Sequence, residues 1–316
     1  MDPDGQTAAA ILSQNGIDFH CLQRLQRGLR NIVFQVDDQY VLRMNRQPAS
    51  HACMLRECDL NKRLRAIAPV PQSLKFGIFS DNSAYQLWEF VPGEQLADVW
   101  PGLDPTTQVQ LVDELCAILE QVHAVKFDGY GPICSRPHSY ATWVDYARAE
   151  LADSPFAEGD SSRWRQVVDR LRFQIWERIN RCQWVEKPAL VHNDLLMTNV
   201  IVRDGHIAAL IDWELALRAP LDHETYKLES FCRFPGVVGV SGDFHRLWEL
   251  IVRRYPAMFS HPDLKNRLDA QGLLALWRMF RYDVQHGHDP RALASDFIKR
   301  VGCILEGRVD RLAIRT

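Results

Sequence analysis

The chain has 316 residues, of which 47% are hydrophobic and 24% charged, with a formal net charge of -3. This length and apolar share allow two lobes with separate cores and exclude a disordered or fibrous chain. The charge is nearly balanced and forms no stripe of Lys and Arg, so we expect no nucleic-acid partner. It is uneven, however, because residues 104–160 hold ten acidic and three basic side chains. That excess either attracts a cationic substrate or forms an ordinary solvated helix surface.

No pattern directs the chain to a membrane or to an oxidising compartment. The eight cysteines are scattered without a C-x-x-C pair, which predicts neither a disulfide framework nor a zinc site. Residues Met1 to Gln6 are acidic and polar, and no later apolar run has the length needed to span a bilayer. We expect a cytoplasmic protein with reduced thiols and no membrane partner.

The first ninety residues are predicted to form an antiparallel sheet with one inserted helix. The helix is predicted at His51 to Arg65, where apolar residues recur at helical spacing, and the segment Ala68-Pro69-Val70-Pro71 ends it. Runs rich in β-branched and aromatic residues predict the strands Ile32 to Val36, Tyr40 to Met44, Ser73 to Phe79 and Ala84 to Phe90.

After Val91-Pro92-Gly93 helical periodicity dominates, so the lobe boundary is predicted near Pro92, between residues 1–91 and residues 92–316. One β-rich interruption runs from Ala189 to Trp213, with a hairpin around Asp204-Gly205. The fold class is therefore α+β, with a small sheet lobe followed by a larger, mainly helical lobe. The predicted helices are Thr107 to His123, Tyr140 to Leu151, Ser162 to Cys182 and most of the chain after Leu221.

The chemistry is concentrated in His192-Asn-Asp194, in Asn199 and, across the hairpin, in Asp212. Transfer of a phosphoryl group needs a carboxylate that orients the attacking hydroxyl, and oxygen ligands that hold magnesium on the phosphates. Asp194, Asn199 and Asp212 supply this set. A loop and a hairpin that return to the same strand ends bring them together. An Asp or Asn alone in a loop more often caps a turn, but H-x-D-x-x-x-x-N with a later Asp is far more restrictive.

This stretch resembles the catalytic segment of the aminoglycoside phosphotransferase and choline kinase superfamily, whose members carry H-G-D or H-N-D, then L-x-x-x-N, then I-D-[WF]-[EG]. The resemblance implies a bilobal, protein-kinase-like fold, ATP or GTP as phosphate donor, and Mg²⁺ as cofactor. It makes Asp194 the catalytic carboxylate, His192 a brace for the loop, and Asn199 with Asp212 the magnesium ligands. Glu224 falls where the family usually has an Asp that bonds back to the catalytic loop.

The sheet lobe can be tested separately for a nucleotide site. Such a lobe needs a loop over the phosphates, a cation on a strand and an acid on the next helix. Gly28-Leu-Arg-Asn31 resembles the short phosphate loop of the family, and Arg43 occupies the place where protein kinases use Lys. Glu57 on the following helix is the natural partner of Arg43. Without the downstream motif, it would be equally plausible that Arg43 is an ordinary surface residue and Glu57 an ordinary solvated one.

The segment Tyr85 to Glu94 resembles the hinge between kinase lobes. An extended crossing exposes backbone groups, so the Glu89 carbonyl and the Val91 amide are the expected contacts with a purine edge. The resemblance runs from about Gly28 to about Glu229 and is faintest in the helices from Thr107 to Lys187, where substrate-specific insertions are expected.

The leading hypothesis is an antibiotic-resistance type of phosphotransferase that acts on an amino sugar or a related polyhydroxylated natural product, with a small, cationic substrate as its partner. A metabolic kinase for choline, ethanolamine or thiamine is the alternative, because His-Asn-Asp and Asp-Trp-Glu are frequent spellings there. A nucleotide-binding pseudokinase is less favoured, since it would not need the complete catalytic set. The acidic side chains expected on the substrate side are Asp145, Glu150, Asp153 and Glu214.

Overall fold

The computed structural model describes residues 2–25, 31–80, 82–135, 138–152, 154–156, 162–285 and 287–306. The chain divides into two compact units. The first contains residues 1–124, 132–137 and 194–217, and the second contains residues 125–131, 138–193 and 218–316. The boundary predicted near Pro92 does not coincide with this division, because a helix and a hairpin that follow Pro92 in the chain pack within the first unit.

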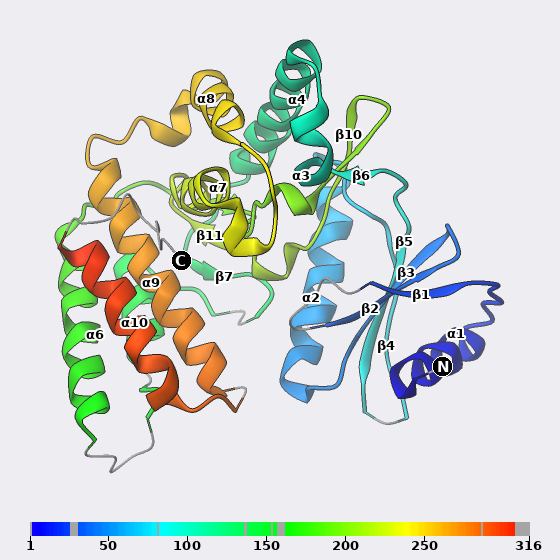
Figure 1. Cartoon of the computed structure of the whole chain (residues 1–316). Helices are drawn as coiled ribbons and strands as arrows, with labels where there is room; N and C mark the ends of the chain where they lie inside the picture. Colours follow the sequence, from blue (N-terminus) through cyan, green and yellow to red (C-terminus); the bar gives the residue numbers. More distant parts are fainter. Residues whose placement is uncertain are drawn as a thin grey trace. The chain divides into compact units, whose positions relative to one another are not determined.

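The first unit is built on a five-stranded antiparallel sheet in the order β1-β2-β3-β5-β4 (Figure 1). The register pairs Val33 with Arg43, and Arg43 with Gln86, so Arg43 lies on a central strand. The antiparallel sheet and the helical remainder confirm the predicted α+β fold class. The strands are β1 (Leu22–Leu25), β2 (Ile32–Val36), β3 (Tyr40–Asn45), β4 (Ser73–Ile78) and β5 (Ala84–Glu89).

The two faces of this sheet are covered by different helices. Successive side chains of a strand point to opposite faces, so Leu42 and Met44 pack on one side while Arg43 points to the other. The first side is closed by α1 (Pro3–Gln14), whose Ile11 and Leu12 join the buried cluster. The other side faces α2 (Pro48–Leu64), the helix predicted from the sequence.

Helix α1 was not predicted, although its start carries a recognisable signal. The Asp2 carboxylate accepts a hydrogen bond of 2.7 Å from the Gly5 amide, and Pro3 occupies the first helical position. Both features are typical of a helix N-terminus. The alanine run that follows is a weak hydrophobic pattern, but Ala8 lies fully buried against the sheet.

The remaining elements of the first unit form around a second, three-stranded sheet in the order β10-β9-β6. Gly93, directly before β6, has a φ of 148°, and a Cβ at this position would lie 2.5 Å from the Val202 carbonyl oxygen. Only glycine therefore fits here without displacing β9. These elements are β6 (Glu94–Gln95), α3 (Leu96–Val99), η1 (Trp100–Gly102), α4 (Pro105–Ala124), η2 (Met197–Asn199), β9 (Val200–Arg203), β10 (His206–Leu210) and η3 (Trp213–Leu215).

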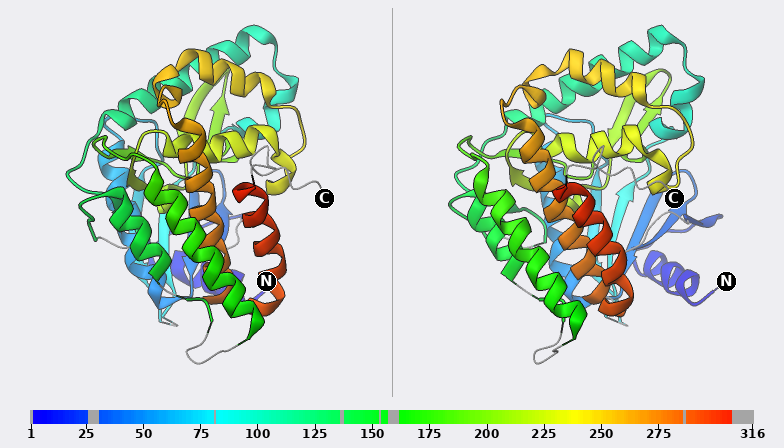
Figure 2. Two further views of the ribbon diagram at one scale, coloured as in Figure 1. Left: turned by 90° about the vertical axis from the view of Figure 1, so that its left-hand side faces the viewer. Right: turned by 60° about the vertical axis from the view of Figure 1, so that its left-hand side comes forward.

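The second unit is mainly helical. Helices α6, α9 and α10 lie side by side (Figure 2), and α9 also contacts α5 and α7. Trp277 of α9 and Phe297 of α10 are buried between them with ring centroids 5.9 Å apart. A short three-stranded sheet has the order β7-β11-β8.

The bounds in this unit follow the predicted helices closely. No helix in the described part of the chain combines the length and apolar composition that crossing a membrane requires. The elements are β7 (Gly131–Pro132), α5 (Trp143–Ala152), α6 (Arg163–Arg181), β8 (Ala189–Val191), β11 (Leu217–Ala219), α7 (His223–Arg233), η4 (Pro235–Val238), α8 (His245–Arg254), η5 (Pro256–Phe259), α9 (Leu264–Gln285) and α10 (Pro290–Leu305).

Candidate active site

The loop that follows β8 carries the predicted catalytic Asp194. Asn199 anchors this loop, because its Nδ2 donates to the Asp194 carbonyl at 2.9 Å. The Asn199 carbonyl in turn accepts from the Ile211 amide at 2.9 Å, which brings the backbone next to Asp212 against the loop. The structure therefore places three predicted residues, Asp194, Asn199 and Asp212, on adjoining backbone segments of the first unit.

Asp212 is presented by a tight turn at the end of β10. Its φ of 66° lies in the left-handed region, which an Asp enters more readily than most residues but still at a cost. The turn is held by Trp213, which is fully buried and donates from Nε1 to the Leu210 carbonyl at 3.1 Å. This local strain at a carboxylate is typical of functional sites.

Arg43 gathers the predicted nucleotide residues of the sheet lobe around one buried guanidinium. Its Nη1 donates to both carboxylate oxygens of Glu57, at 3.0 and 2.9 Å. Its Nη2 lies 3.5 Å from Asp212 Oδ1 and is hydrogen bonded to Glu214. Asn31 joins the cluster, because its Nδ2 donates to Glu214 Oε2 at 3.1 Å. Glu214, expected on the substrate side, thus lies beside the predicted nucleotide residues instead.

The charges in this cluster do not cancel. Burial opposes the charge of Arg43, but Glu57, Glu214 and Asp212 outweigh burial and raise its pKa above the usual value. For Glu57, burial is the largest cause that raises the pKa to about 7; Asp212 and Glu214 add to the rise, and Arg43 opposes it. Three carboxylates around one cation leave an excess of negative charge, which favours the binding of a further cation.

The donor set fits magnesium. In the described part of the chain, no three His, Cys, Asp or Glu side chains gather into a group that would hold a metal ion. Magnesium needs less than this, because it is usually bound by one or two protein oxygens together with phosphates and water. The Asp212 carboxylate is partly exposed. Because the Asn199 Nδ2 is bound to the Asp194 carbonyl, the Oδ1 of Asn199 points away from that carbonyl and can act as a second ligand.

Glu224 holds the loop from within the second unit. Its fully buried carboxylate accepts the His192 amide at 2.6 Å and the Asn193 amide at 3.0 Å. Glu224 therefore makes the contact with the predicted catalytic loop that the resemblance to the family assigned to an Asp. The His192 side chain is also fully buried, a place that suits its expected bracing role. His223, which sequence reasoning missed, lies 2.9 Å from Asn193, and a separation of 30 residues leaves no local signal of that contact.

In the predicted hinge segment, two backbone amides already donate hydrogen bonds within the protein. The Glu89 amide donates to the Gln72 carbonyl at 3.0 Å, and the Phe90 amide donates to the Gln39 carbonyl at 2.9 Å. Glu89 is exposed and Val91 is half-buried. Contacts of the Glu89 carbonyl and the Val91 amide with a purine stay a prediction. Gly28, the remaining predicted nucleotide residue, lies outside the described residues.

The predicted acidic substrate side chains are not gathered by the structure. Asp145 is partly exposed, accepts a hydrogen bond of 2.7 Å from Thr142 and lies 3.7 Å from Arg148. Glu150 is buried, with its carboxylate 3.1 Å from Arg281 and 3.6 Å from Arg278. The structure thus corrects the expectation for Glu150: its charge is neutralised in the helical core, where it cannot attract a substrate. Asp153 lies outside the described residues.

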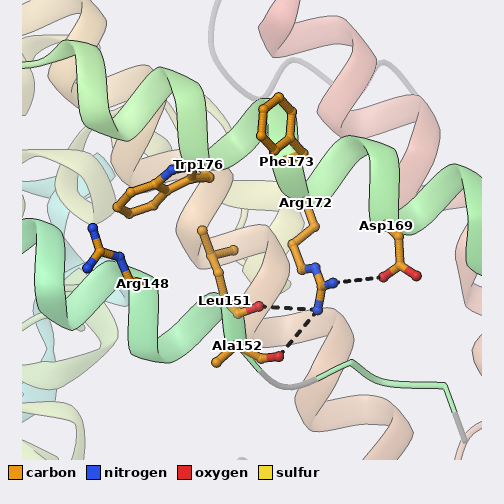
Figure 3. A pocket seen from close by; sticks show the side chains of 7 residues that line it. All are labelled: Arg148, Leu151, Ala152, Asp169, Arg172, Phe173 and Trp176. Atoms are coloured by element: carbon orange, nitrogen blue, oxygen red, sulfur yellow. Dashed lines mark hydrogen bonds and ion pairs between the residues drawn. The ribbon is translucent and has the colours of Figure 1, made fainter. Parts of the chain in front are cut away.

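A groove of about 610 Å³ is lined by residues of α5 and α6 (Figure 3). It is not an acidic pocket, because its cations are Arg148 and Arg172 and its one carboxylate, Asp169, is paired with Arg172 at 3.3 Å. Arg148 lies over the Trp176 ring, 4.8 Å from its centroid. This lining argues against cation binding in the groove.

One curated protein matches about half of the chain in sequence. Hygromycin-B 4-O-kinase from Escherichia coli is 26% identical over 166 residues, which are 50% of this chain and 47% of that protein. The chain thus spans about half the length of this curated relative.

Two solved structures are similar to the whole chain. The crystal structure of a thermostable mutant of aminoglycoside phosphotransferase APH(4)-Ia in its apo form has a TM-score of 0.66 and 21% identity, over 95% of this chain and 98% of that one. The gentamicin complex of APH(2")-IIa has a TM-score of 0.66 and 15% identity, over 98% of both chains. At these identities the likeness shows the fold. The model of the phosphotransferase enzyme family matches residues 22–266, which is more than half of the chain, and the protein belongs to this family.

Proposed function

We propose that this protein transfers the γ-phosphoryl group of ATP or GTP to a hydroxyl group of a small molecule. The observation that carries the proposal is the cluster around Arg43, in which one buried guanidinium is shared by Glu57, Asp212 and Glu214. Three carboxylates around a single cation would be a poor structural device, because they repel one another. They suit a site that receives magnesium and phosphate charge together.

Each residue has a distinct role in this proposal. The Asp194 carboxylate accepts the proton of the acceptor hydroxyl while the new bond from oxygen to the γ-phosphorus forms and the bond to the bridging oxygen breaks. Arg43 binds phosphate oxygens, and Glu57 keeps it in place. Asn199 and Asp212 hold magnesium, which, when bound, neutralises charge on the phosphate oxygens.

For the acceptor we propose an aminoglycoside-like compound. The names of the similar proteins refer to hygromycin B, gentamicin and other aminoglycosides. These are cationic, polyhydroxylated molecules, and the acidic excess of residues 104–160 suits a cationic substrate. Within this proposal Asp145, whose side chain is partly exposed, remains a candidate for substrate contact, whereas the buried Glu150 does not.

A coupled assay with MgATP and MgGTP over a panel of aminoglycosides, macrolides, choline, ethanolamine and thiamine tests both donor and acceptor. Turnover with an aminoglycoside supports the proposal. Turnover with choline, ethanolamine or thiamine alone favours the metabolic kinase, and binding of nucleotide without any turnover favours the pseudokinase.

The Asp194→Ala variant tests the chemistry within the same assay. It should lose more than about nine-tenths of kcat, because the proton acceptor is gone, while calorimetric titration with MgATP still shows binding near wild-type affinity. Asp204→Ala, on the exposed turn of the same hairpin, is the matched control and should keep its turnover. Turnover of the Asp194→Ala variant above that limit contradicts the assignment.

A further inference from the structure

The backbone of Asn193 has an unusual conformation, directly before the proposed catalytic residue. Its φ of 63° lies in the left-handed region, where glycine is the default and Asn is the next most tolerated type. The side chain is 5% exposed, so its amide oxygen cannot rely on water. A residue held in this conformation requires restraint from its surroundings.

Two consecutive residues at the start of α7 provide that restraint. Glu224 accepts the Asn193 backbone amide at 3.0 Å, and His223 Nε2 lies 2.9 Å from Asn193 Oδ1. Because an amide oxygen can only accept a hydrogen bond, Nε2 carries the hydrogen and the imidazole is the neutral Nε2–H tautomer. The two contacts hold the backbone and the side chain of the same loop residue.

The surroundings of His223 keep it neutral. Burial is the largest cause that lowers its pKa to about 3, and the charges of Arg278 and Lys227 add to the effect. The edge of the ring packs against Trp143 at a centroid distance of 4.9 Å. Among the described residues, Nδ1 has no hydrogen-bond partner. Burying a nitrogen without a hydrogen bond, as with Nδ1, costs free energy. The hydrogen bond from Nε2 is therefore the interaction that favours a histidine over an apolar residue at this position.

We propose that His223 is a positioning residue that holds Asn193, and through it the direction of Asp194, by one hydrogen bond from Nε2. The inference rests on the proposed function, because it takes Asp194 as the group that accepts the substrate proton. His223 itself does not touch the reacting atoms. Its removal should therefore lower kcat and leave the KM for the nucleotide unchanged, since misplacement of a catalytic group by a fraction of an ångström slows the chemical step.

A histidine that served only the core would give a different result in a double-mutant cycle. Asn193→Gly removes the side chain that His223 holds and supplies a residue that adopts positive φ without strain. His223→Phe keeps the ring against Trp143 but has no donor. We expect His223→Phe to lower kcat about tenfold in the Asn193 background and less than about twofold in the Asn193→Gly background. A loss of equal size in both backgrounds overturns the proposal.

Two further variants sharpen the cycle. His223→Gln has an amide that can still donate to Asn193 and should keep kcat within about threefold of wild type. Thr225→Val is the matched control on the same helix, because Thr225 is buried and its hydroxyl donates to the Met258 carbonyl at 3.3 Å. It should lower Tm without changing kcat. A His223→Gln variant as slow as His223→Phe contradicts the role of the donor.

A measurement independent of turnover separates this inference from the proposed function. In nitrogen-15 NMR of the full chain, His223 should remain the neutral Nε2–H tautomer from pH 8 to pH 5, and His223→Phe should shift the Asn193 side-chain amide signals while Thr225→Val does not. An Nδ1–H tautomer, or a titrating ring, overturns the hydrogen bond. If wild type turns over no acceptor and hydrolyses no MgATP, the proposed function and the positioning role fail together, and the NMR result still decides the bond itself.

Discussion

At the scale of single residues, Arg43 shows how one side chain links distant parts of the sequence. It lies on β3, its partner Glu57 is on α2, and Glu214 follows 171 residues later. Glu57 is 2% exposed, so its charge depends on this guanidinium. Breaking such a pair from one side leaves a buried charge without compensation.

Arg43→Met should therefore lower the free energy of unfolding by about 3–5 kcal/mol, measured by urea denaturation. The double variant Arg43→Met with Glu57→Gln should recover at least half of this loss, because no buried carboxylate is left alone. Neither variant should bind MgATP with wild-type affinity in calorimetry. If the double variant binds MgATP as wild type does, Arg43 has only a structural role.

The second test at this scale concerns the metal. If Asp212 and Asn199 bind magnesium, Asp212→Asn should raise the magnesium concentration needed for half-maximal activity about tenfold or more and lower kcat strongly. The rate is measured against free magnesium at a fixed nucleotide concentration. Asp204→Asn, on the exposed turn between β9 and β10, is the control and should match wild type. If the magnesium dependence of Asp212→Asn is unchanged, Asp212 serves only to form the turn and does not bind magnesium.

At the scale of elements, the start of α7 is fixed by a buried ion pair. Arg267 of α9 donates from Nη2 to Asp222 Oδ1 at 2.9 Å, and its Nε lies 2.7 Å from Oδ2. Arg267 also pairs with Glu186 and lies over the Trp184 ring, 4.4 Å from its centroid. Asp222 directly precedes His223, so this pair determines where α7 presents its first residues.

Arg267→Ala should lower the free energy of unfolding by about 3–5 kcal/mol, because the Asp222 carboxylate would remain buried without a partner. Arg253→Ala is the control: its side chain is 75% exposed, and its pair with Glu249 at 3.7 Å contributes at most about 1 kcal/mol. Both are measured by urea denaturation at pH 7. A loss below about 1 kcal/mol for Arg267→Ala would show that the helix start does not depend on this pair.

At the scale of the whole molecule, two buried groups give opposite pH dependences of stability. The pKa of His223 falls from 6.5 to about 3 on folding. Below about pH 6.5 the unfolded chain therefore binds a proton at this imidazole that the folded chain does not bind, and the stability declines as the pH drops. The pKa of Glu57 rises from 4.5 to about 7, so the folded chain takes up a proton first, and stability increases as pH drops below about 7. The two contributions therefore have opposite signs between pH 7 and pH 5.

In wild type the two groups therefore partly offset each other in this range. Relative to wild type, His223→Gln should become more stable as the pH falls from 7 to 5, and Glu57→Gln should become less stable. Urea denaturation at closely spaced pH values gives both slopes. Slopes of the same sign in the two variants would show that at least one of the groups does not titrate as its burial implies.

The sequence alone determined the features that depend on local spacing. Strand alternation places Leu42 and Met44 on one face of the sheet and Arg43 on the other, and helical spacing predicts α2 with Glu57. The motif from His192 to Asn199 predicted that Asp194 and Asn199 share one loop, whereas the bond from Asn199 to the Asp194 carbonyl was found only in the structure. Hydrophobic periodicity was sufficient for the α+β class, because each lobe must bury its apolar side chains.

Contacts between distant segments were decided only by the tertiary structure. Glu214 was expected near the substrate but pairs with Arg43, and Glu150 was expected on a surface but is enclosed by Arg278 and Arg281. The bond from His223 to Asn193 joins the start of a helix to a loop 30 residues earlier. The sequence shows which residues are acidic but not which of them are buried, because burial depends on how the elements pack. Burial in turn determines whether a carboxylate can attract a ligand or instead neutralises an arginine.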